Sequence, residues 1–502
     1  MIESPTAAAD ARAERRSKYH EADVVVVGAG VFGCAIAYAL AQQGRSVILL
    51  ERWMKEPDRI VGELLQPGGI VALRQLGLAD TLEGIDAVPC YGYKVSFHGE
   101  GVDIPYPSFD ENGRMIHASS NTETTSSSAK QKEGRCFHHG RFIMNLRKAC
   151  QKQENITIFE TEVTATIRGD DKDTVLGVKS KTTTDAKKGE KKDDYFFGQL
   201  TIIADGYASK FRKEHLNQAP VVKSKFYALE LIDAPMPSPG YGHVVIGKAF
   251  PVLLYQIGTH ETRALIDVPA NIPEASPAAG GVRGYIKNVV MPTLPPQMRP
   301  CFEAALADGK IPRSMPNSYL PPSRQTANGM LLLGDALNMR HPLTGGGMTV
   351  AFNDCVILSD LLHPSRVTDL ADPVAIKNVL SEFHWRRKSL TSIINVLAMA
   401  LYALFAANDR QLRALQTGCF HYFQRGHASE PMALMGGLLH QPSKLAYHFF
   451  SVAFLAIWLN ALDLMSGSIF GFLKAPLALI DGILILWRAS VVFLPVMWRE
   501  LN

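Results

Sequence analysis

The sequence predicts an α/β protein with a Rossmann-like domain, an inserted mixed β-sheet domain and a C-terminal helical membrane anchor. A β-branched run, Asp23–Val27, leads directly into Gly28-Ala-Gly-Val-Phe-Gly33, as expected for a strand buried on both faces of a parallel sheet. A second buried-strand pattern, Met330–Leu333, precedes Gly334-Asp335. From Lys444 onward the chain is mostly apolar. These three observations define the predicted fold class.

Composition limits the possible classes of function. A chain of 502 residues is long enough for roughly two or three domains. Its 47% hydrophobic and 20% charged residues exclude a wholly disordered, collagen-like or coiled-coil protein. The 52 basic and 48 acidic residues are too balanced for nucleic-acid binding, and we expect no such partner. The seven scattered cysteines indicate reduced thiols, and we expect no metal site. Residues 1–21 are polar and lack a signal-peptide core, so we expect a disordered N-terminus.

The first predicted elements form a complete βαβ unit. After the strand at residues 23–27, an Ala-rich helix is expected over Cys34–Gln43, and Gly44 ends it. Ser46–Leu50 predicts a second strand, with Glu51 at its end. A glycine-rich turn between strand and helix, with an acid about 20 residues further on, is a strong dinucleotide-binding pattern.

Each residue of this pattern has a physical role. Gly28 allows the tight turn, Gly30 lets backbone N–H groups approach a pyrophosphate, and Gly33 allows the helix to pack closely on the strand. Glu51 can accept hydrogen bonds from both hydroxyls of an adenosine ribose and would repel a 2′-phosphate. It therefore favours FAD or NAD over NADP. The residues that complete this part of the predicted site are Val31, Phe32 and Arg52.

The middle of the chain is expected to be rich in strands. Two polar segments, 119–132 and 180–194, are expected to be solvated insertions or hairpin tips, because such composition cannot bury enough apolar area to become ordered. From Pro235 to Pro322, frequent prolines separate strand-like runs. Examples of these runs are Tyr241–Ile246 and Ala264–Val268. We therefore expect a β-sheet substrate domain over residues 221–324.

A second cofactor motif follows the strand at residues 330–333. The carboxylate of Asp335 could bind the hydroxyls of a ribityl chain, which is specific to flavin. Gly345-Gly346-Gly347 leads into a predicted helix, so its N–H groups and the positive helix end can face the flavin pyrimidine ring. The alternative, an ordinary N-cap at Asp335, is less favoured before three glycines. We expect an FAD-binding domain over residues 22–220 and 325–388.

These motifs resemble a known enzyme family. The three fingerprints of single-component FAD monooxygenases are matched by Gly28–Gly33, Ala204-Asp205-Gly206 and Gly334-Asp335. Longer segments resemble the squalene monooxygenase (squalene epoxidase) family in its fungal form. These segments are Pro57–Gly69, His138–Met144 and Asn338–Met348. The resemblance runs from about Ala22 to the C-terminus.

The resemblance implies FAD- and NADPH-dependent transfer of one oxygen atom from dioxygen to squalene, giving 2,3-oxidosqualene for sterol (ergosterol) biosynthesis. It also implies a membrane NADPH-cytochrome reductase as electron donor, and an endoplasmic reticulum location facing the cytosol, with lipid droplets as a second location. By the same resemblance Tyr93, hydrogen-bonded to Gln66, lies near flavin and substrate. The family's FAD contacts correspond to Gly28, Gly30, Gly33, Glu51, Arg59, Arg141, Val163, Asp335 and Met348, and Asp205, Gly206, Gly346 and Gly347 complete the predicted cofactor site.

The chemistry of an alkene agrees with this set of residues. An alkene has no acidic proton and no leaving group, so neither a catalytic triad nor paired carboxylates are required. Reduced flavin and dioxygen give a hydroperoxide with an electrophilic distal oxygen, so the flavin supplies the difficult step. Tyr93 is the candidate orienting group, acting through Gln66, and the alternative is a tyrosine that only anchors a strand.

Squalene can be held only by burial of apolar area, so its pocket should be long and lined by aromatic residues. The residues expected to contribute to this pocket are Phe405, Phe420, Phe423, Pro431, Leu434 and His440.

The predicted C-terminal helical region, 389–502, is membrane-associated from about residue 444. Ser389–Asn408 and Leu445–Leu462 contain no formal charge over 20 and 18 residues, which is long enough to cross a bilayer. Leu477–Met497 is equally apolar but is broken by Asp481, Arg488 and Pro495, and charges at a bilayer centre are costly. A monotopic anchor is therefore preferred, with a membrane hairpin second. Trp458, Trp487, Trp498 and Arg499 suit a membrane interface.

Two other functions use the same cofactor motifs. An FAD-dependent isoprenoid reductase or cyclase at the membrane would share Glu51 and Asp335. A flavin-containing membrane scaffold or sensor is the non-enzymatic alternative. Asp205-Gly206 and the long match around Gln66 favour a monooxygenase, in which reducing equivalents enter near Asp205 or come from a separate reductase.

Overall fold

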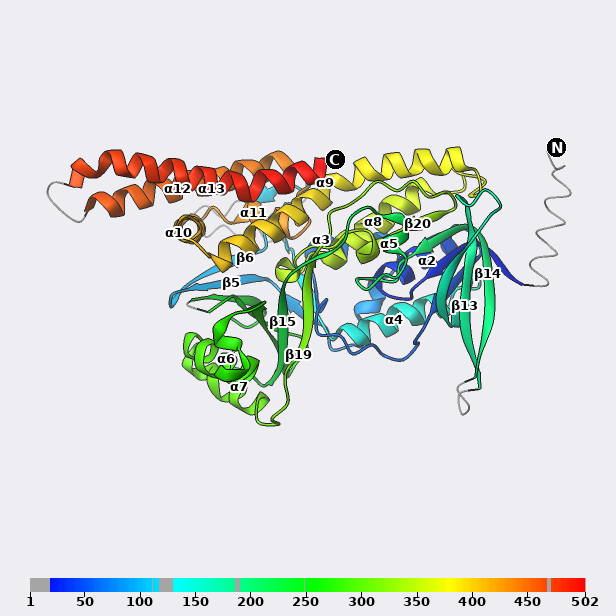
Figure 1. The fold of residues 1–502 in the computed structure, drawn as a ribbon, viewed down its shortest axis with the longest axis horizontal. Coiled ribbons are helices and arrows are strands. Elements are labelled where there is room, and N and C mark those ends of the chain that lie inside the picture. The colour runs from blue at the N-terminus through cyan, green and yellow to red at the C-terminus, as the bar shows by residue number, and fades with distance from the viewer. Residues whose placement is uncertain are drawn as a thin grey trace.

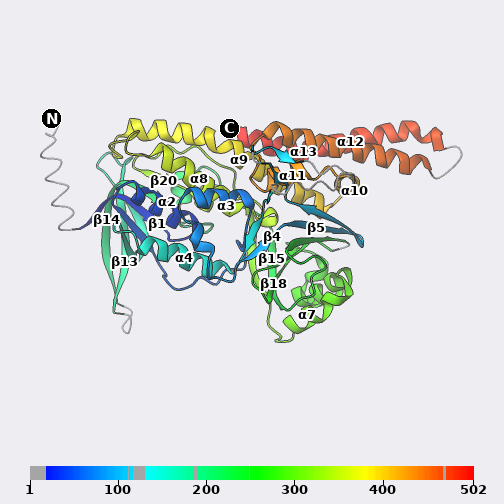
Figure 2. The same cartoon turned by 180° about the vertical axis from the view of Figure 1, so that it is seen from behind.

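The computed structural model describes residues 19–110, 112–116, 130–185, 190–247, 249–466 and 471–501. The molecule is elongated, with two sheet-containing bodies side by side and long helices along one edge (Figures 1 and 2). This arrangement confirms the predicted α/β class with mixed sheets and apolar C-terminal helices. Residues 1–18, most of the predicted disordered N-terminus, lie outside the described part of the chain.

The first sheet has seven strands in the order β11-β2-β1-β14-β13-β12, with β20 paired to β14. Its strands are β1 (His20–Val27), β2 (Val47–Glu51), β11 (Ile156–Glu160), β12 (Glu162–Arg168), β13 (Val175–Asp185), β14 (Glu190–Ile203) and β20 (Met330–Leu332). Strands β11, β2, β1, β14 and β20 are mutually parallel. Their continuous apolar runs are buried with helices α2 (Val31–Gln42), α4 (His139–Gln151) and α8 (Gly347–Leu361) in one core.

Two details of this body differ from the prediction or refine it. The strand β1 begins at His20, two residues inside the segment expected to be disordered, because the His20 ring stacks on Phe196 with centroids 4.6 Å apart. The polar segment 180–194 lies at the end of the β13–β14 hairpin, where Lys181 pairs with Asp193. The described residues of this segment are therefore the paired strand ends of a hairpin. Residues 117–129 of the other polar segment are outside the described residues.

The second sheet also has seven strands, in the order β19-β15-β18-β17-β16-β5-β6. Its strands are β5 (Gly92–Phe97), β6 (Glu100–Pro105), β15 (Val221–Ile232), β16 (Tyr241–Ile246), β17 (Val252–Gln256), β18 (Glu261–Pro269) and β19 (Arg313–Tyr319). The predicted boundary at residues 221–324 is therefore wrong for this sheet, because β5 and β6 come from the segment assigned to the cofactor domain. Strand β5 pairs in parallel with β16, from Gly92 opposite Tyr241 to Phe97 opposite Ile246.

Residues 273–305 are helical, where alternating strands and turns were expected. The helices are α6 (Gly281–Tyr285) and α7 (Arg299–Ala305), with a π-helical turn at Ile286–Val290 after α6 and short 3-10 turns elsewhere in the segment. The prolines in this segment cause the difference, because proline near the start of a helical turn needs no N–H partner and its φ angle suits a helix. Ile286, Val290 and Phe302 pack on one face of the second sheet. The opposite face is left for the cavity described below.

Short elements join the two bodies. Two three-stranded sheets are formed by β3 (Leu64–Leu65), β10 (Gly134–Cys136) and β4 (Val88–Cys90), and by β8 (Met115–Ile116), β7 (Ser108–Phe109) and β9 (Lys130–Gln131). The short helices here are α3 (Pro67–Gln75) and α5 (Arg212–His215).

The C-terminal region consists of α9 (Pro373–Ala406), α10 (Arg410–Gln424), α11 (Ser429–Met435), α12 (Pro442–Ser466) and α13 (Ala475–Leu501). The expected boundary at residue 389 falls inside α9, which begins after the N-cap Asp372 with proline at its first position. Helices α9, α12 and α13 are long and apolar enough to cross a membrane, by length and composition. Their most apolar windows are 56%, 11% and 33% buried, so α9 serves mainly as a packing helix and α12 is mostly exposed.

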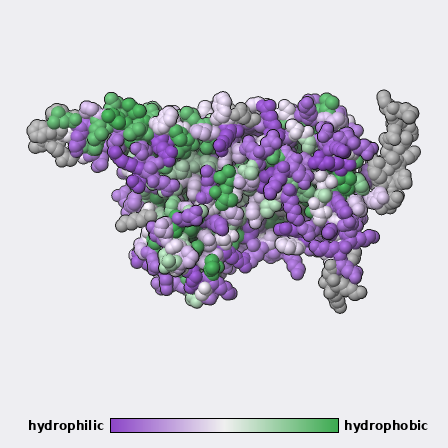
Figure 3. All heavy atoms as spheres, in the orientation of Figure 1, coloured by the Kyte–Doolittle hydropathy of each residue, from purple (hydrophilic) through white to green (hydrophobic). Residues whose placement is uncertain are grey.

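Helices α12 and α13 lie side by side as a hairpin (Figures 1 and 2). Helix α13 continues through Pro495. Two charged residues in the middle of α13 are paired at the N-terminus of α10: Asp481 with Arg410, and Arg488 Nε with Asp409 Oδ2 at 2.8 Å. Pairing turns these charges inward. The exposed surface of the hairpin is correspondingly apolar (Figure 3).

Candidate functional site

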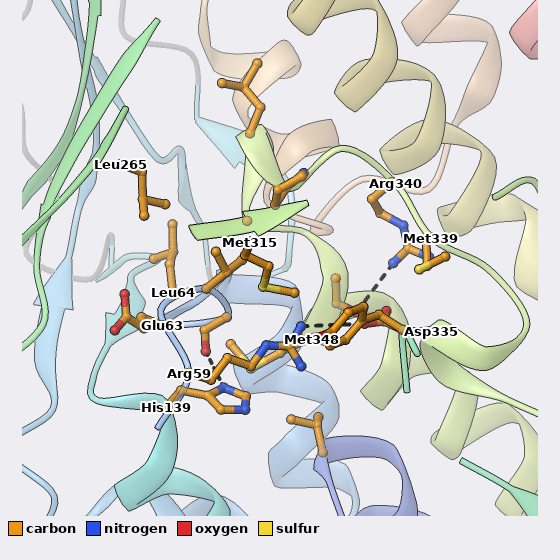
Figure 4. A pocket seen from close by; sticks show the side chains of 18 of the residues that line it. Arg59, Glu63, Leu64, His139, Leu265, Met315, Asp335, Met339, Arg340 and Met348 are labelled. Carbon is orange, nitrogen blue, oxygen red and sulfur yellow. Dashed lines mark hydrogen bonds and ion pairs between the residues drawn. The ribbon is translucent and has the colours of Figure 1, made fainter. Parts of the chain in front are cut away.

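A cavity lies between the glycine-rich turns of the first sheet and the inner face of the second sheet. From the cofactor motifs it is lined by Gly30, Val31, Phe32, Arg59, Gly206, Asp335, Gly347 and Met348, and from the other side by Tyr93, Leu253, Tyr255, Leu265, Met315 and Leu343. Figure 4 shows Arg59, Asp335, His139 and Arg340 around it. The fold therefore brings together motifs that are some 300 residues apart in sequence.

The first glycine-rich turn separates structural from binding positions. A Cβ atom at Gly28 would lie 2.5 Å from the carbonyl oxygen of Ala204, and one at Gly33 would lie 1.8 Å from that of Gly28. Both positions are closed to any side chain. A Cβ atom at Gly30 would meet no protein atom within 4 Å, and Gly30 lines the cavity at the N-terminus of α2. Its open face and free helix end suit a phosphate group.

Glu51 lies behind this turn rather than in the wall of the cavity. Its Oε2 accepts a hydrogen bond from the Ala29 N–H at 2.8 Å. Arg147, which is 4% exposed, places a guanidinium nitrogen 3.5 Å from the same oxygen and donates from Nε to the Ala29 carbonyl at 3.0 Å. The carboxylate and the turn are thus held by one buried arginine. The sequence analysis did not identify Arg147, although it stands in the helix of the His138–Met144 motif.

Among the predicted cofactor residues that do not line the cavity are Arg141, Arg52 and Val163. Arg141, assigned there by resemblance, is not among the lining residues, and its charge acts on Asp86 and His138. Arg52 stacks on the exposed Trp53 ring at 4.4 Å. Val163 is buried in β12, two residues after Thr161, whose N–H donates to the Glu51 carbonyl.

The charged part of the cavity is formed by Arg59 and Asp335. An Arg59 guanidinium nitrogen lies 3.7 Å from Asp335 Oδ2, and Arg59 Nε is buried without a hydrogen-bond partner among the described residues. His139 Nδ1 lies 2.8 Å from the Gly62 carbonyl oxygen. Burial, reinforced by the charge of Arg59, lowers the pKa of His139 to about 3. The imidazole is therefore neutral, and the uncompensated donor on Arg59 remains for an anionic ligand.

Arg212 connects the second and third fingerprints, and the sequence analysis did not identify it. Its Nη2 donates to the carbonyl oxygens of Gly206, Tyr207 and Asp335 at 3.2, 3.1 and 2.8 Å. Gly206 lines the cavity, whereas Asp205 Oδ2 accepts the N–H of Lys210 at 3.1 Å and closes its own loop. A buried arginine that donates hydrogen bonds to several backbone carbonyls leaves no recognisable pattern in the sequence. Only its position seven residues after Asp205 could have indicated it.

The three consecutive glycines serve different purposes. Gly345 has a φ angle of 62°, which favours glycine. A Cβ atom at Gly346 would lie 2.5 Å from Ile394 Cγ2, so this residue allows α8 to pack on α9. Gly347 has no protein atom within 4 Å of an added Cβ position and lines the cavity with Met348. The N-terminus of α8 therefore opens onto the cavity.

The predicted hydrogen bond between Gln66 and Tyr93 is present. Gln66 Nε2 donates to Tyr93 Oη at 2.7 Å and to the Thr344 carbonyl at 2.6 Å, and Tyr106 Oη donates to Gln66 Oε1. The amide is thus fully used, and its orientation makes Tyr93 Oη an acceptor. Burial raises the pKa of Tyr93 well above its ordinary value. The phenol keeps its proton and can donate it into the cavity.

The predicted hydrocarbon-binding residues divide into three groups. Phe405 and Phe420 pack in the apolar cluster that also contains Tyr93 and Leu343, and the Phe420 ring lies 5.1 Å from that of Phe97. A second, almost wholly apolar cavity lies among α9, α10, α11 and α12. Of the predicted residues it is lined by Phe423, Pro431 and Leu434. His440 lines neither cavity and lies 3.1 Å from the Gly437 carbonyl.

The residues around the main cavity fit FAD. The open positions at Gly30 and Gly347 are both at the N-termini of long helices, where N–H groups and the helix dipole favour anionic groups. The unused Arg59 Nε provides a further donor. An apolar wall of Leu253, Leu265 and Met315 adjoins them. The cavity therefore offers sites for phosphates at one end and for a hydrocarbon at the other.

Comparison with known proteins agrees with this geometry. A family model described as squalene epoxidase matches residues 197–480, and one described as FAD dependent oxidoreductase matches residues 23–55. Squalene epoxidase ERG1 of Gibberella zeae is 65% identical over 491 residues, covering 98% of each chain. Squalene epoxidase ERG1 of Saccharomyces cerevisiae is 41% identical, covering 95% of this chain and 96% of the relative.

Solved structures with a similar fold are flavin enzymes. PqsL, a probable FAD-dependent monooxygenase from Pseudomonas aeruginosa, has a TM-score of 0.60 at 21% identity, covering 79% of this chain and 99% of that chain. The p-nitrophenol 4-monooxygenase PnpA of Pseudomonas putida has a TM-score of 0.61 at 18% identity, covering 84% and 100%. At these identities the likeness establishes the fold alone.

Proposed function

This chain belongs to the squalene epoxidase family, and on that basis we propose that the cavity between its two sheets is where FAD and squalene meet. The protein is an FAD-dependent monooxygenase that epoxidises squalene to 2,3-oxidosqualene in sterol biosynthesis, with dioxygen as oxidant and NADPH as the source of electrons. One oxygen atom enters the product and the other leaves as water. An isoprenoid reductase or cyclase activity is not favoured by this membership.

The cofactor is held by residues of both glycine-rich turns. In this proposal Gly30 and the N-terminus of α2 bind the pyrophosphate, with Arg59 as a further donor, and Glu51 binds the adenosine ribose. Asp335 binds the ribityl chain, and Gly347 with Met348 contacts the flavin ring. The open Cβ positions at Gly30 and Gly347 carry this assignment. Bound FAD supplies the activation of dioxygen.

Tyr93 orients the reacting groups and keeps a proton available. Its Oη accepts from Gln66, and in this proposal its own hydrogen turns from the neighbouring Tyr106 hydroxyl to an oxygen atom at the apolar end of the cavity. Leu253, Leu265 and Met315 exclude water and bury one end of the hydrocarbon. Because Gln66 also bonds the Thr344 carbonyl, Tyr93 is positioned relative to the glycine-rich loop that we assign to flavin.

Squalene reaches this end of the cavity from the C-terminal helices. The apolar cluster of Tyr93 and Leu343 continues through Phe405 and Phe420 to Phe423, which lines the second cavity together with Pro431 and Leu434. The exposed apolar surface of α12 and α13 is compatible with membrane association. A hydrocarbon dissolved in lipid could then enter without crossing water. We place His440 near this entrance and assign it no contact with squalene.

Two further proposals concern the cell. Electrons come from a membrane NADPH-cytochrome reductase, because the described residues contain a single glycine-rich turn of the dinucleotide-binding kind. The enzyme is associated with the endoplasmic reticulum membrane, with its catalytic domain facing the cytosol and lipid droplets as a second location. The apolar hairpin supports membrane binding. Seven cysteines without a disulfide support a reducing environment.

The test is oxygenation of squalene by detergent-solubilised protein with FAD and isotopically labelled dioxygen. Product formed with NADPH plus a microsomal reductase, but not with NADPH alone, is expected and supports the reductase proposal. One labelled oxygen atom in oxidosqualene, detected by mass spectrometry, identifies substrate and reaction together. If the protein binds flavin and the flavin is reduced, but no oxygen enters squalene, the isoprenoid reductase or cyclase would be favoured instead.

A further inference from the structure

The C-terminal end of α13 contacts the cofactor site through buried polar side chains. Glu500 lies in the last turn of α13 and is only 1% exposed. Its Oε1 accepts a hydrogen bond from Asn395 Nδ2 of α9 at 2.9 Å, and its backbone carbonyl accepts from Lys388 Nζ. The carboxylate of a mostly apolar helix is thus enclosed by protein. These contacts dock the C-terminal end of α13 on α9.

Asn395 continues the contact toward the cavity. It is fully buried, and its Oδ1 accepts a hydrogen bond from Arg340 Nε at 2.8 Å. A carboxylate requires a donor and a guanidinium requires an acceptor, and one amide side chain supplies both. The donor end of Asn395 therefore faces Glu500 and the acceptor end faces Arg340. The three side chains form one continuous line from α13 through α9 to the cavity.

Arg340 is part of the cavity wall (Figure 4). Its Nη2 donates to Asn338 Oδ1 at 2.6 Å, and its Nη1 lies 3.5 Å from the Gly347 carbonyl oxygen. Gly347 is the open glycine at the start of α8. Arg340 also lies within the electrostatic reach of Asp335. Its orientation affects both the loop before α8 and the charge at the cavity.

We infer that Asn395 and Glu500 are positioning residues of the cofactor site. Glu500 orients the amide of Asn395, the amide holds Arg340, and Arg340 fixes the loop that carries Gly347. The hairpin of α12 and α13 is then a component of the catalytic centre in addition to a membrane-associated element. This inference rests on the FAD placement proposed above. Since energetic coupling between sites is reciprocal, FAD binding stabilises the docked end of α13.

The test is the FAD affinity of the purified full-length protein, measured by flavin fluorescence, for Asn395→Ala, Glu500→Ala and the double variant. Each single variant is expected to weaken FAD binding by about tenfold, which corresponds to about 1.4 kcal/mol. Because both residues act through one line of contacts, the double variant is expected to bind FAD no more weakly than the worse single variant. Glu500→Gln, whose amide oxygen can still accept from Asn395, is expected to recover most of the affinity.

Arg488→Gln is the matched control on the same helix. It breaks the α13 ion pair with Asp409 of the α10 N-terminus, which does not touch the cavity, and FAD affinity is expected to stay within about twofold of the wild type. Hydrogen–deuterium exchange of the wild type tests the same coupling without a variant, in case the alanine variants do not fold. Addition of FAD to apoprotein is expected to slow exchange in residues 495–500 more than in residues 475–485.

Three outcomes decide the inference. Unchanged FAD affinity in Asn395→Ala and Glu500→Ala, in a protein that loses FAD on Asp335→Ala, overturns the coupling and leaves the cofactor site intact. Exchange at the end of α13 that does not respond to FAD overturns it as well. Normal FAD binding by Asp335→Ala overturns the proposed cofactor site itself, and with it the basis of the inference.

Discussion

Single residues divide the cavity into a charged end and a neutral end. Glu63 lines the neutral end, where Arg263 compensates its charge. Arg59 and Asp335 face each other at 3.7 Å beside an uncharged His139. At the other end Tyr93 keeps its proton because burial raises its pKa. The charged end suits the polar chain of a flavin cofactor, and the neutral end suits an alkene and an oxygen atom. Substitutions at the two ends should therefore affect different steps.

Asp335→Ala is expected to empty the FAD site. The variant removes the carboxylate that we assign to the ribityl chain and leaves the Arg59 charge unbalanced. Flavin absorbance of the purified protein measures the loss. Asp360→Ala is the matched control, because Asp360 lies on the adjacent helix α8 but pairs with the exposed Arg366 and Arg386. Equal flavin content in both variants would remove Asp335 from the cofactor site.

Tyr93→Phe is expected to keep FAD and to slow epoxidation by roughly tenfold to hundredfold, the effect of losing one hydrogen bond that is formed during the reaction. The phenyl ring preserves the packing on Leu343 and the Phe420 cluster. Turnover of squalene under saturating reductase and the flavin content of the same sample provide the measurement. Unchanged turnover would leave Tyr93 as a strand anchor.

Asp267 predicts a pH-dependent stability. It is buried in β18, where Ser224 Oγ and Asn317 Nδ2 donate to its carboxylate, and burial raises its pKa to about 6. The folded protein therefore binds this proton more tightly than the unfolded chain. The contribution of Asp267 to stability falls as pH rises from the ordinary value of 3.8 to about 6, and it stays low above that range.

Asp267→Asn cannot ionise and should remove this dependence. The difference in free energy of unfolding, variant minus wild type, should be larger at about pH 8 than at about pH 4. The increase should be at most about 3 kcal/mol, which is two pK units at about 1.4 kcal/mol each. Thermal unfolding at the two pH values measures the difference. An offset that is the same at both would show that Asp267 does not change its charge over this range.

At the scale of secondary structure, the hairpin of α12 and α13 turns two charges of α13 toward α10 and many apolar side chains outward. Asp481 and Arg488 are paired with Arg410 and Asp409. The large side chains at the surface include three tryptophans, Trp458, Trp487 and Trp498, which are 60–69% exposed. Indole rings prefer the boundary between lipid headgroups and hydrocarbon. The hairpin therefore presents a surface suited to a lipid leaflet.

Combining Trp458→Ser, Trp487→Ser and Trp498→Ser is expected to reduce binding to phospholipid vesicles by at least about tenfold, because each change removes apolar area from the lipid contact. Flotation of the full-length protein with vesicles measures the bound fraction. Ile311→Ser is the control. Ile311 is 75% exposed and lies just before β19 of the second sheet, away from the hairpin, so this variant should not change flotation. Equal binding by the triple variant would show that the hairpin does not contact lipid through these rings.

At the scale of the whole molecule, buried pairs and shared strands join the two bodies. Arg263 of β18 donates to both oxygens of Glu63, which precedes β3, and Tyr255 of β17 donates to the same carboxylate at 3.1 Å. The strands β5 and β6 extend the second sheet beyond β16. The second sheet is therefore not an independent unit of sequence, and the cavity exists only where both bodies are in place.

A fragment of residues 221–324 is consequently expected not to fold alone. It lacks β5 and β6, so β16 would be left as an open edge, and Phe226 and Leu265 would lose apolar partners such as Val61 and Tyr93. Circular dichroism of the fragment should show no cooperative thermal transition, whereas the full chain should show one. A cooperative transition in the fragment would contradict this view of the second sheet.

Much of the fold could be predicted from local patterns. The βαβ unit around the first glycine-rich turn, the strands β16 and β20, and the helix α8 lie close to their predicted positions, because buried strands and helix starts leave short, continuous sequence signals. The helices at 281–305 were missed because prolines were read as breaks between strands. Of the residues predicted from motifs, Gly30, Arg59 and Asp335 line the cavity, whereas Arg52, Arg141 and Val163 do not. Arg147 and Arg212, which donate to backbone carbonyls, were not identified.

The sequence by itself determined the cofactor class, because glycines, Glu51 and Asp335 stand at fixed spacings along the chain. The resemblance of its longer motifs to a known family indicated the family and the chemistry. Only the tertiary structure decided which arginine holds Glu51, which strands complete the second sheet, and how the end of α13 reaches Arg340 through Asn395. These relations join residues more than 50 positions apart. Local periodicity carries no information on such contacts, since they depend on which buried donors and acceptors the fold brings within hydrogen-bonding distance.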